Sequence, residues 1–188
     1  SVYPDLHWHG THVAGTVAGS GVRSDKNNSA GNPNNGSPFQ WRGMAPNAGI
    51  IDGGDPTNAS ALLNHIQNNS LDLTNHSHIL GLDGAYNNNN RQTDRIIRGG
   101  TSSGGTLVPR RPVVFAAANN GDNSPQYGNV IGHYSLLNQM KNTIVVGSWA
   151  AGPNRLSNFS SLGPAYDGRL KPDVIAPGSG IQSAGVRR

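Results

Sequence analysis

The alternation of apolar and polar blocks along the chain predicts a series of short strands separated by helices and loops. The clearest strand is predicted at Val113–Ala117, a continuous apolar run between Pro112 and Asn119-Asn120-Gly121, as expected of a central strand covered on both faces. The pattern recurs at Ile144–Gly147 and, more weakly, at Val174–Ala176. Runs of this length suit a buried sheet and are too short to cross a bilayer.

Weaker patterns predict the remaining elements. Apolar residues at helical spacing predict a helix over Thr57–Asn68, with Thr57 or Asn58 as its cap. Turn-forming residues without periodicity predict a surface loop at Ser24–Pro38. Two further strands and one helical turn are expected, at Ala48–Ile51, Leu71–Thr74 and Thr93–Arg98 respectively.

Strands that alternate with helices of this length predict an α/β fold, a doubly wound and mainly parallel sheet with right-handed crossovers and helices on both faces. In such sheets the chemistry collects at the carboxyl ends of the strands. Asn119 follows the clearest strand and is therefore a candidate site residue. At 188 residues the chain is long enough for one domain with its own core.

The strongest chemical signal is the heptapeptide HGTHVAG at residues 9–15. His9 precedes small apolar residues, which predicts that its imidazole lies in the first turn of a short helix. The small residues allow another backbone to approach closely, so we expect this helix to be buried at the centre of the molecule. A lone buried histidine is usually a satisfied core residue, but the length of the motif favours a functional role.

A metal site is the alternative for the same histidines. His7, His9 and His12 are spaced as H-x-H-x-x-H, which resembles the zinc-ligand run of binuclear hydrolases. Such motifs place an acidic residue before the last histidine, where this chain has Thr11. The other histidines fall at no tight ligand spacing: His65, His76, His78 and His133. A His-rich metal-dependent hydrolase is therefore a remote alternative.

Charge and composition exclude several classes of partner and of catalytic group. The net charge is +4, but the basic residues are scattered and only Arg110-Arg111 and Arg187-Arg188 are adjacent, so neither a nucleic-acid partner nor a membrane partner is expected. The chain has no cysteine, which excludes a disulfide and a thiolate nucleophile. It starts at Ser1 without a signal peptide, which we interpret as a processed product or an excised fragment.

Five segments resemble landmarks of the subtilisin-like serine peptidases (subtilases, family S8), in the order of that family. They are HGTHVAG at 9–15, GMAP at 43–46, FAAANNG at 115–121, LSNFSSLGP at 156–164 and DGRLKPDVIAPG at 167–178. The matches run from about residue 5 to about residue 184. The resemblance implies a subtilisin-like fold and a serine endopeptidase that cleaves a peptide or protein substrate through an acyl-enzyme.

The resemblance also implies roles for individual residues. His9 would be the general base and His12 structural, while Asn119 would donate its side-chain N–H to the oxyanion. The alternative that Asn119 caps a turn stays open. The substrate-binding strand would correspond to Asp72–Gly81, to which an extended peptide adds as a further strand, with either Ser77 or Leu80-Gly81 matching the family's Ser-Leu-Gly. The substrate-binding residues would be Ser77, Leu80, Gly81, Ala117 and Ala118.

Two departures from the family pattern add bulk near the expected site. Trp8 stands where a glycine commonly precedes the histidine, and Ala118 replaces the glycine before the oxyanion asparagine. Neither substitution excludes catalysis.

Two members of the catalytic triad have no match. In subtilases the triad runs Asp, His, Ser, yet neither an Asp-Thr-Gly or Asp-Ser-Gly strand nor a Gly-Thr-Ser-Met-Ala helix is present. Asp5 lies too close to His9 to orient it, and GTSSG at 100–104 imitates the nucleophile motif but precedes the oxyanion strand. We therefore expect residues 1–188 to be an internal fragment of a subtilase catalytic domain, truncated at both ends and inactive alone.

The sequence thus favours a secreted serine endopeptidase as the parent protein. A catalytically inactive subtilase-like module for binding or scaffolding is the alternative. Calcium is common in this family and the Asn/Asp-rich loops offer oxygen ligands, but no loop shows a ligand pattern, so no metal or cofactor is assigned. The oligomeric state is left open.

Overall fold

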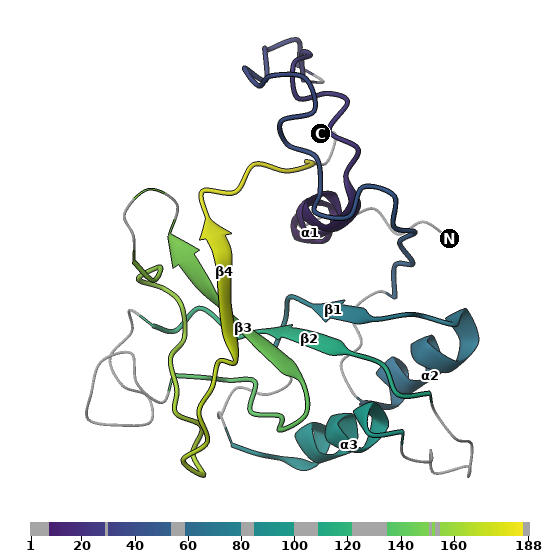
Figure 1. Ribbon diagram of the computed structural model, residues 1–188, viewed down its shortest axis with the longest axis vertical. Helices are drawn as coiled ribbons and strands as arrows, with labels where there is room; N and C mark the ends of the chain where they lie inside the picture. Colours follow the sequence, from purple (N-terminus) through teal and green to yellow (C-terminus); the bar gives the residue numbers. More distant parts are fainter. Residues whose placement is uncertain are drawn as a thin grey trace. The chain divides into compact units, whose positions relative to one another are not determined.

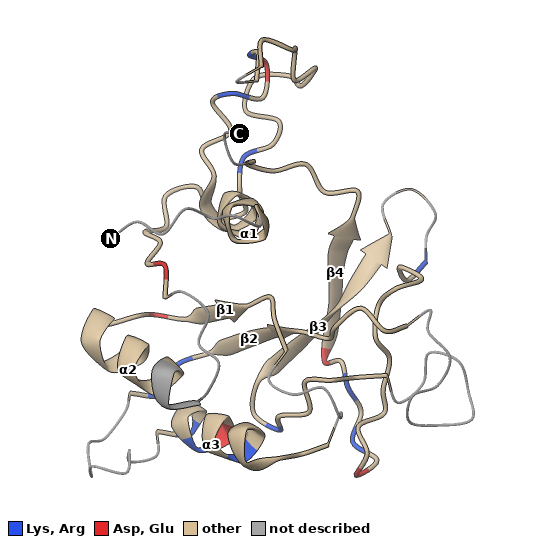
Figure 2. Cartoon of the chain, turned by 180° about the vertical axis from the view of Figure 1, so that it is seen from behind, with Lys and Arg blue, Asp and Glu red and all other residues tan. Residues whose placement is uncertain are grey.

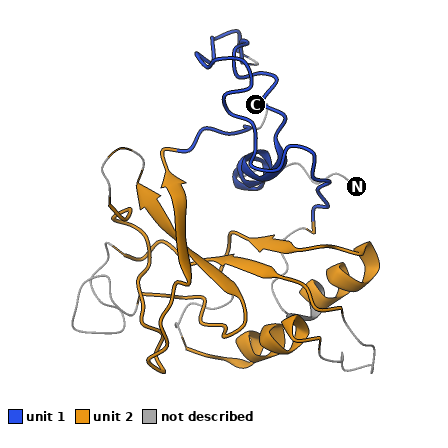
Figure 3. Ribbon diagram, viewed as in Figure 1, with its two compact units in different colours: residues 1–52, 181–188 blue, residues 53–180 orange. Residues whose placement is uncertain are grey.

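The computed structural model describes residues 8–28, 30–53, 59–79, 85–99, 109–121, 135–150, 152 and 155–185. The chain divides into two compact units, one of residues 1–52 and 181–188 and one of residues 53–180 (Figure 3). The described helices and strands follow one another as α1 (His9–Ala18), α2 (Ala59–Asn69), β1 (Thr74–His76), α3 (Asn88–Ile97), β2 (Val113–Ala116), β3 (Ile144–Ala150) and β4 (Val174–Ser179) (Figure 1). None of these helices is long and apolar enough to span a membrane.

The unit of residues 53–180 is built on a parallel sheet. Its described strands lie in the order β1-β2-β3-β4, and each neighbouring pair is parallel. Phe115 of β2 lies opposite His76 of β1 on one side and Val145 of β3 on the other. The carboxyl ends of parallel strands meet at one edge of a sheet, so the residues after β1 and β2 are brought together. The predicted parallel α/β fold is confirmed.

β2 is the central strand that its apolar run predicts. Val113 and Phe115 are each 1% exposed, because they face helices α2 and α3. One hydrophobic cluster joins the two helices to the sheet, and it consists of Leu62, Leu63, Ile66, Ile96, Val113, Phe115 and Met140. A second cluster, of Ala117, Leu136 and Val145, continues the core beyond the end of β2.

Helix α3 is longer than the single turn expected at Thr93–Arg98, since it begins at Asn88. Asn87 and Asn90 form a reciprocal capping box: the Asn87 side chain accepts from the Asn90 amide at 3.1 Å, and the Asn90 side chain accepts from the Asn87 amide at 3.0 Å. Asparagine is a weak helix former in the middle of a helix but a strong cap. The asparagine run therefore starts this helix.

The prediction of a strand at Ala48–Ile51 is wrong. The Ala48 amide bonds to the Ala45 carbonyl in a turn, and residues 48–51 join no strand of the described sheet. Ile50 and Ile51 are about half exposed. An apolar run becomes a strand only where a neighbour satisfies its backbone. The strand expected at Leu71–Thr74 is displaced as well, because β1 begins at Thr74.

In the other unit, two of the family-like segments pack together. The last carbonyls of a helix have no partner within it, and here GMAP at 43–46 supplies partners for α1. The amides of Gly43, Met44 and Ala45 donate to the carbonyls of Gly19, Thr16 and Val17 respectively. The helix is less buried than expected, since Gly15 is its buried residue while His9 and Gly10 are exposed. Small residues allow close packing but do not by themselves bury a helix.

In the described part of the chain, Figure 2 shows Lys and Arg on the loops of both units and on α3.

Candidate active site

His9 is the first residue of α1, as the sequence predicts, and its side chain is exposed. The helix starts after Trp8, whose φ is +55°. The Trp8 indole packs edge-on against both histidines, with ring centroids 6.3 Å from His9 and 6.0 Å from His12. Trp8 thus occupies the left-handed backbone region that favours glycine, the residue that the family pattern has at this place.

His12 is tied to the backbone of residues 181–184. Its Nε2 lies 3.2 Å from the Ile181 carbonyl, and its own carbonyl accepts from the Ser183 hydroxyl at 2.8 Å. Gly15 makes room for the same segment, because a Cβ there would lie 2.6 Å from the Ser183 Oγ and 2.8 Å from the Ala184 amide nitrogen. These contacts agree with a structural role for His12.

The loop that carries Asn119 is held by the FSSLGP segment. Ser161 bonds to it twice: its amide donates to the Ala118 carbonyl at 3.0 Å, and its hydroxyl accepts from the Asn120 amide at 3.0 Å. The Gly121 amide donates to the Phe159 carbonyl at 2.9 Å. Gly121 also permits the close approach, because a Cβ there would collide with the Ser160 carbonyl. The backbone on both sides of Asn119 is therefore fixed.

The Asn119 side chain itself is exposed and makes no hydrogen bond with any described residue. Ala118, which precedes it, has a φ of +91°. The chain thus turns sharply just after β2, at the sheet edge where the sequence predicts chemistry. A capping asparagine would accept a backbone N–H, and no described amide donates to this one.

The predicted substrate-binding residues differ in their surroundings. Ser77 is half-buried just after β1, and its hydroxyl accepts from the Asn75 side chain at 3.2 Å. Ala117 is buried against Leu136 and Val145, and its amide donates to the Val146 carbonyl at 2.9 Å. Ala118 is half-buried. Leu80 and Gly81 lie outside the described residues, as does His7 of the metal alternative.

The two predicted catalytic residues belong to different units. His9 is in the unit of residues 1–52 and 181–188, and Asn119 is in the unit of residues 53–180. Among the described residues no group of three or more His, Asp or Glu side chains is placed to hold a metal ion.

The end of β1 carries a buried neutral histidine. His76 is 6% exposed, its ring stacks on Phe115 with centroids 4.4 Å apart, and its Nε2 lies 3.0 Å from the Thr74 hydroxyl. Burial, with a smaller contribution from neighbouring His78, lowers the pKa of His76 to about 4. His76 is therefore uncharged at neutral pH.

The sequence did not predict the roles of Ser161 and Asn138, which bond to the backbone at the carboxyl ends of β1 and β2. The signal for Ser161 was available, because it lies in FSSLGP. Asn138 lies in a segment that matches no family landmark, yet its side-chain amide contacts the chain just after β1 and at the end of β2.

The chain is similar to parts of several known proteins. Proteins tagB and tagD of Dictyostelium discoideum, both serine protease/ABC transporter B family proteins, are each 61% identical to this chain over 31 residues. The match is 16% of this chain and 2% of each relative. The solved structure of the prenylagaramide maturation protease PagA superposes with a TM-score of 0.53 at 18% identity, over 95% of this chain and 54% of that protease.

The chain thus spans about half of the solved protease and a small part of the curated relatives. At 18% identity the likeness to the solved protease shows the fold alone. The model of the subtilase family, Peptidase_S8, matches residues 1–187. Because this match covers nearly the whole sequence, the chain belongs to the subtilase family.

Proposed function

We propose that residues 1–188 carry the general base and one oxyanion donor of a serine endopeptidase. In this proposal the His9 imidazole takes the proton of a serine hydroxyl as the oxygen attacks the scissile carbonyl carbon. Asn119 donates its side-chain N–H to the resulting oxyanion. His9 then gives the proton to the leaving amine, the acyl-enzyme forms, and water attacks it with His9 acting as base again.

The proposal rests mainly on how the structure holds Asn119. Its side chain is exposed and unbonded among the described residues, while Ser161 and Gly121 fix the backbone on either side. A side-chain donor that stands on a fixed backbone and has no other hydrogen-bond partner is available to a developing oxyanion. Membership of the subtilase family supports the assignment of His9 to the base.

The nucleophile and the orienting acid are proposed to lie outside residues 1–188. No segment of this sequence matches the family motif for either one. A histidine without an activated hydroxyl within about 2.6–3.2 Å performs no acyl transfer. We therefore propose that the 188-residue chain alone does not hydrolyse peptides, and that the protein containing it does.

The test uses the longer protein that contains this chain. His9→Ala should abolish hydrolysis of a chromogenic peptide, with the fold retained by circular dichroism. His12→Gln is the matched control: it should lower the melting temperature, because the Ile181 contact is disturbed, but leave kcat per folded molecule within a few-fold of wild type. Activity of the His9 variant within tenfold of wild type would show that another group is the base.

A catalytically inactive subtilase-like module is the second candidate, favoured by one observation. Trp8 and Ala118 both stand where the family pattern has glycine, and both adopt positive φ. Glycine would adopt this backbone without strain, so the two replacements indicate drift from the family pattern beside the proposed site. The flanking sequence separates the two, since an Asp-Thr-Gly or Asp-Ser-Gly segment upstream and a Gly-Thr-Ser segment downstream favour the peptidase.

A further inference from the structure

The side-chain amide of Asn138 bonds both to the chain just after β1 and to the end of β2. The backbone ladder between these strands ends at His76 and Phe115. Beyond it, the Asn138 Nδ2 donates to the Ala116 carbonyl at 2.8 Å and to the His78 carbonyl at 3.0 Å. A side-chain amide nitrogen carries two N–H bonds, and both are used here. Asn138 thus replaces the next rung of the ladder.

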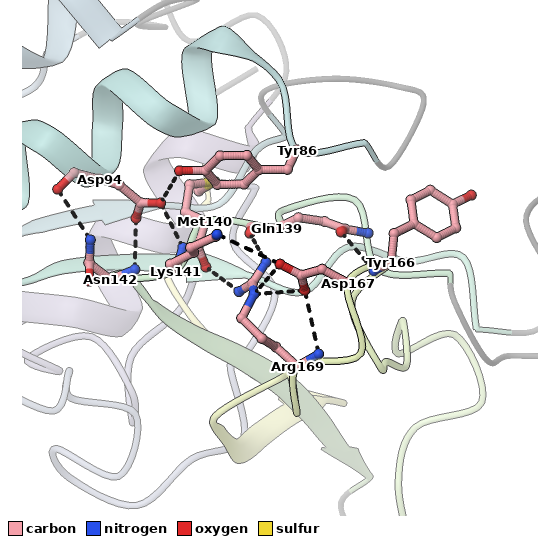
Figure 4. Close-up of polar contacts among 9 residues, drawn as sticks. All are labelled: Tyr86, Asp94, Gln139, Met140, Lys141, Asn142, Tyr166, Asp167 and Arg169. Carbon is pink, nitrogen blue, oxygen red and sulfur yellow. Dashed lines mark hydrogen bonds and ion pairs between the residues drawn. The ribbon is translucent and has the colours of Figure 1, made fainter.

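The segment that carries Asn138 is firmly supported on its other side. Residues 135–140 are buried throughout, and Asn138 is 0% exposed. The Asp94 carboxylate of α3 accepts from the amides of Lys141 and Asn142 at 2.9 and 2.7 Å. Arg169 donates to the Gln139 carbonyl at 2.8 Å, and Figure 4 shows it and Asp94 holding residues 139–142 between them.

Tyr86 strengthens this support, because its hydroxyl donates to Asp94 at 2.8 Å. Burial and the adjacent carboxylate raise the pKa of Tyr86 to about 12, so the hydroxyl remains a donor over the physiological range. The support beneath Asn138 is therefore a hydrogen-bonded network that reaches from α3 to the loop at Arg169.

We propose that Asn138 is a positioning residue that sets the spacing between the substrate-binding strand and the oxyanion loop. The inference rests on the proposed peptidase function, in which Ser77 belongs to the first segment and Asn119 to the second. Asn138 bonds to His78, the residue after Ser77, and to Ala116, close before Asn119. Without the Asn138 side-chain amide, each of the two carbonyls loses one hydrogen bond, and the strand ends shift to compensate. Displacements of about 1 Å can lower catalysis about 100-fold.

Asn138→Leu removes the amide with little change in volume, and Gln139→Leu is its matched control. Gln139 is also a buried amide, 1% exposed, but it bonds to the Leu136 carbonyl and the Tyr166 amide instead of the strand ends. In the longer protein, with active sites titrated, Asn138→Leu should lower kcat at least about tenfold. Gln139→Leu should leave kcat and KM within about twofold while lowering the melting temperature by a similar amount.

A second readout does not depend on activity. In the 188-residue chain, hydrogen exchange of peptides that cover residues 77–79 and 117–121 should speed up in Asn138→Leu and not in Gln139→Leu. If the wild-type protein hydrolyses no peptide, the proposed function fails and the exchange result still decides the positioning role. If Asn138→Leu does not fold, Asn138→Ser, which keeps one donor, should show an intermediate exchange rate. Equal effects of the Asn138 and Gln139 variants on kcat or on exchange would overturn the proposal.

Discussion

Replacing Ala118 by glycine should stabilise the chain, although most substitutions of alanine by glycine destabilise proteins. Ala118 has a φ of +91°, in the region where an L-residue is strained. The strain of a left-handed residue is about 1–2 kcal/mol. Glycine removes it but adds about 0.4–1 kcal/mol of conformational entropy to the unfolded state. The net gain in the free energy of unfolding is therefore about 0.8 kcal/mol.

The neighbouring Ala117 supplies the control. Its φ is not positive, and its methyl group is buried against Leu136 and Val145. Ala117→Gly loses that methyl group, about 0.8 kcal/mol, and has no strain to relieve. Together with the entropy of glycine, about 0.5–1 kcal/mol, the expected loss is about 1.5 kcal/mol. The two substitutions, identical in chemistry and adjacent in sequence, should thus differ by about 2 kcal/mol.

The assay is thermal unfolding of the 188-residue chain followed by far-ultraviolet circular dichroism. For a chain of this size about 1 kcal/mol corresponds to about 2–4 °C, so the melting temperatures of the two variants should lie about 4–8 °C apart. Ala118→Gly should melt at or slightly above wild type and Ala117→Gly below it. If both variants melted lower by the same amount, the strained turn at Ala118 would be refuted.

Two further predictions concern the same unit. The folded state keeps His76 neutral, whereas the unfolded chain binds a proton at this side chain below the ordinary pKa of 6.5. The free energy of unfolding should therefore be unaffected by His76 above pH 6.5 and fall as the pH is lowered towards 4, by at most about 1.4 kcal/mol per pH unit. Urea unfolding over this range should show a flatter pH dependence in His76→Phe, and an unchanged dependence would assign the titration to another group. Asn119→Ala in the longer protein should lower kcat about 100-fold or more with little change in KM, and a larger effect on melting temperature than on turnover would support a turn cap instead.

The starts of β2, β3 and β4 and their carboxyl edge could be predicted, because these continuous apolar runs have the length of a buried strand. β2 matches its predicted range almost to the residue, and Asn119 follows it as expected. The start of α1 at His9 was readable for a related reason, since small residues directly follow the histidine. These features depend on local patterns.

Features that depend on distant partners could not be predicted. The apolar run at Ala48–Ile51 forms no strand in the described sheet, because pairing is a property of the neighbours and not of the run. The two hydrogen bonds from the Asn138 side chain to the carbonyls of Ala116 and His78 join residues far apart in the sequence. Nothing in the segment around Asn138 signals them. The positive φ of Ala118 could not be predicted from the alanine itself, although the glycine that the family pattern has at this place was a signal for it.

The most direct test of the proposed peptidase is to map the serine that a fluorophosphonate labels. In the longer protein that contains this chain, the adduct should lie on a serine outside residues 1–188, and His9→Ala should abolish labelling because the hydroxyl loses its base. The 188-residue chain alone should not be labelled. Stoichiometric labelling of that chain, mapped to Ser102 or Ser103, would contradict the account and make the GTSSG segment the nucleophile.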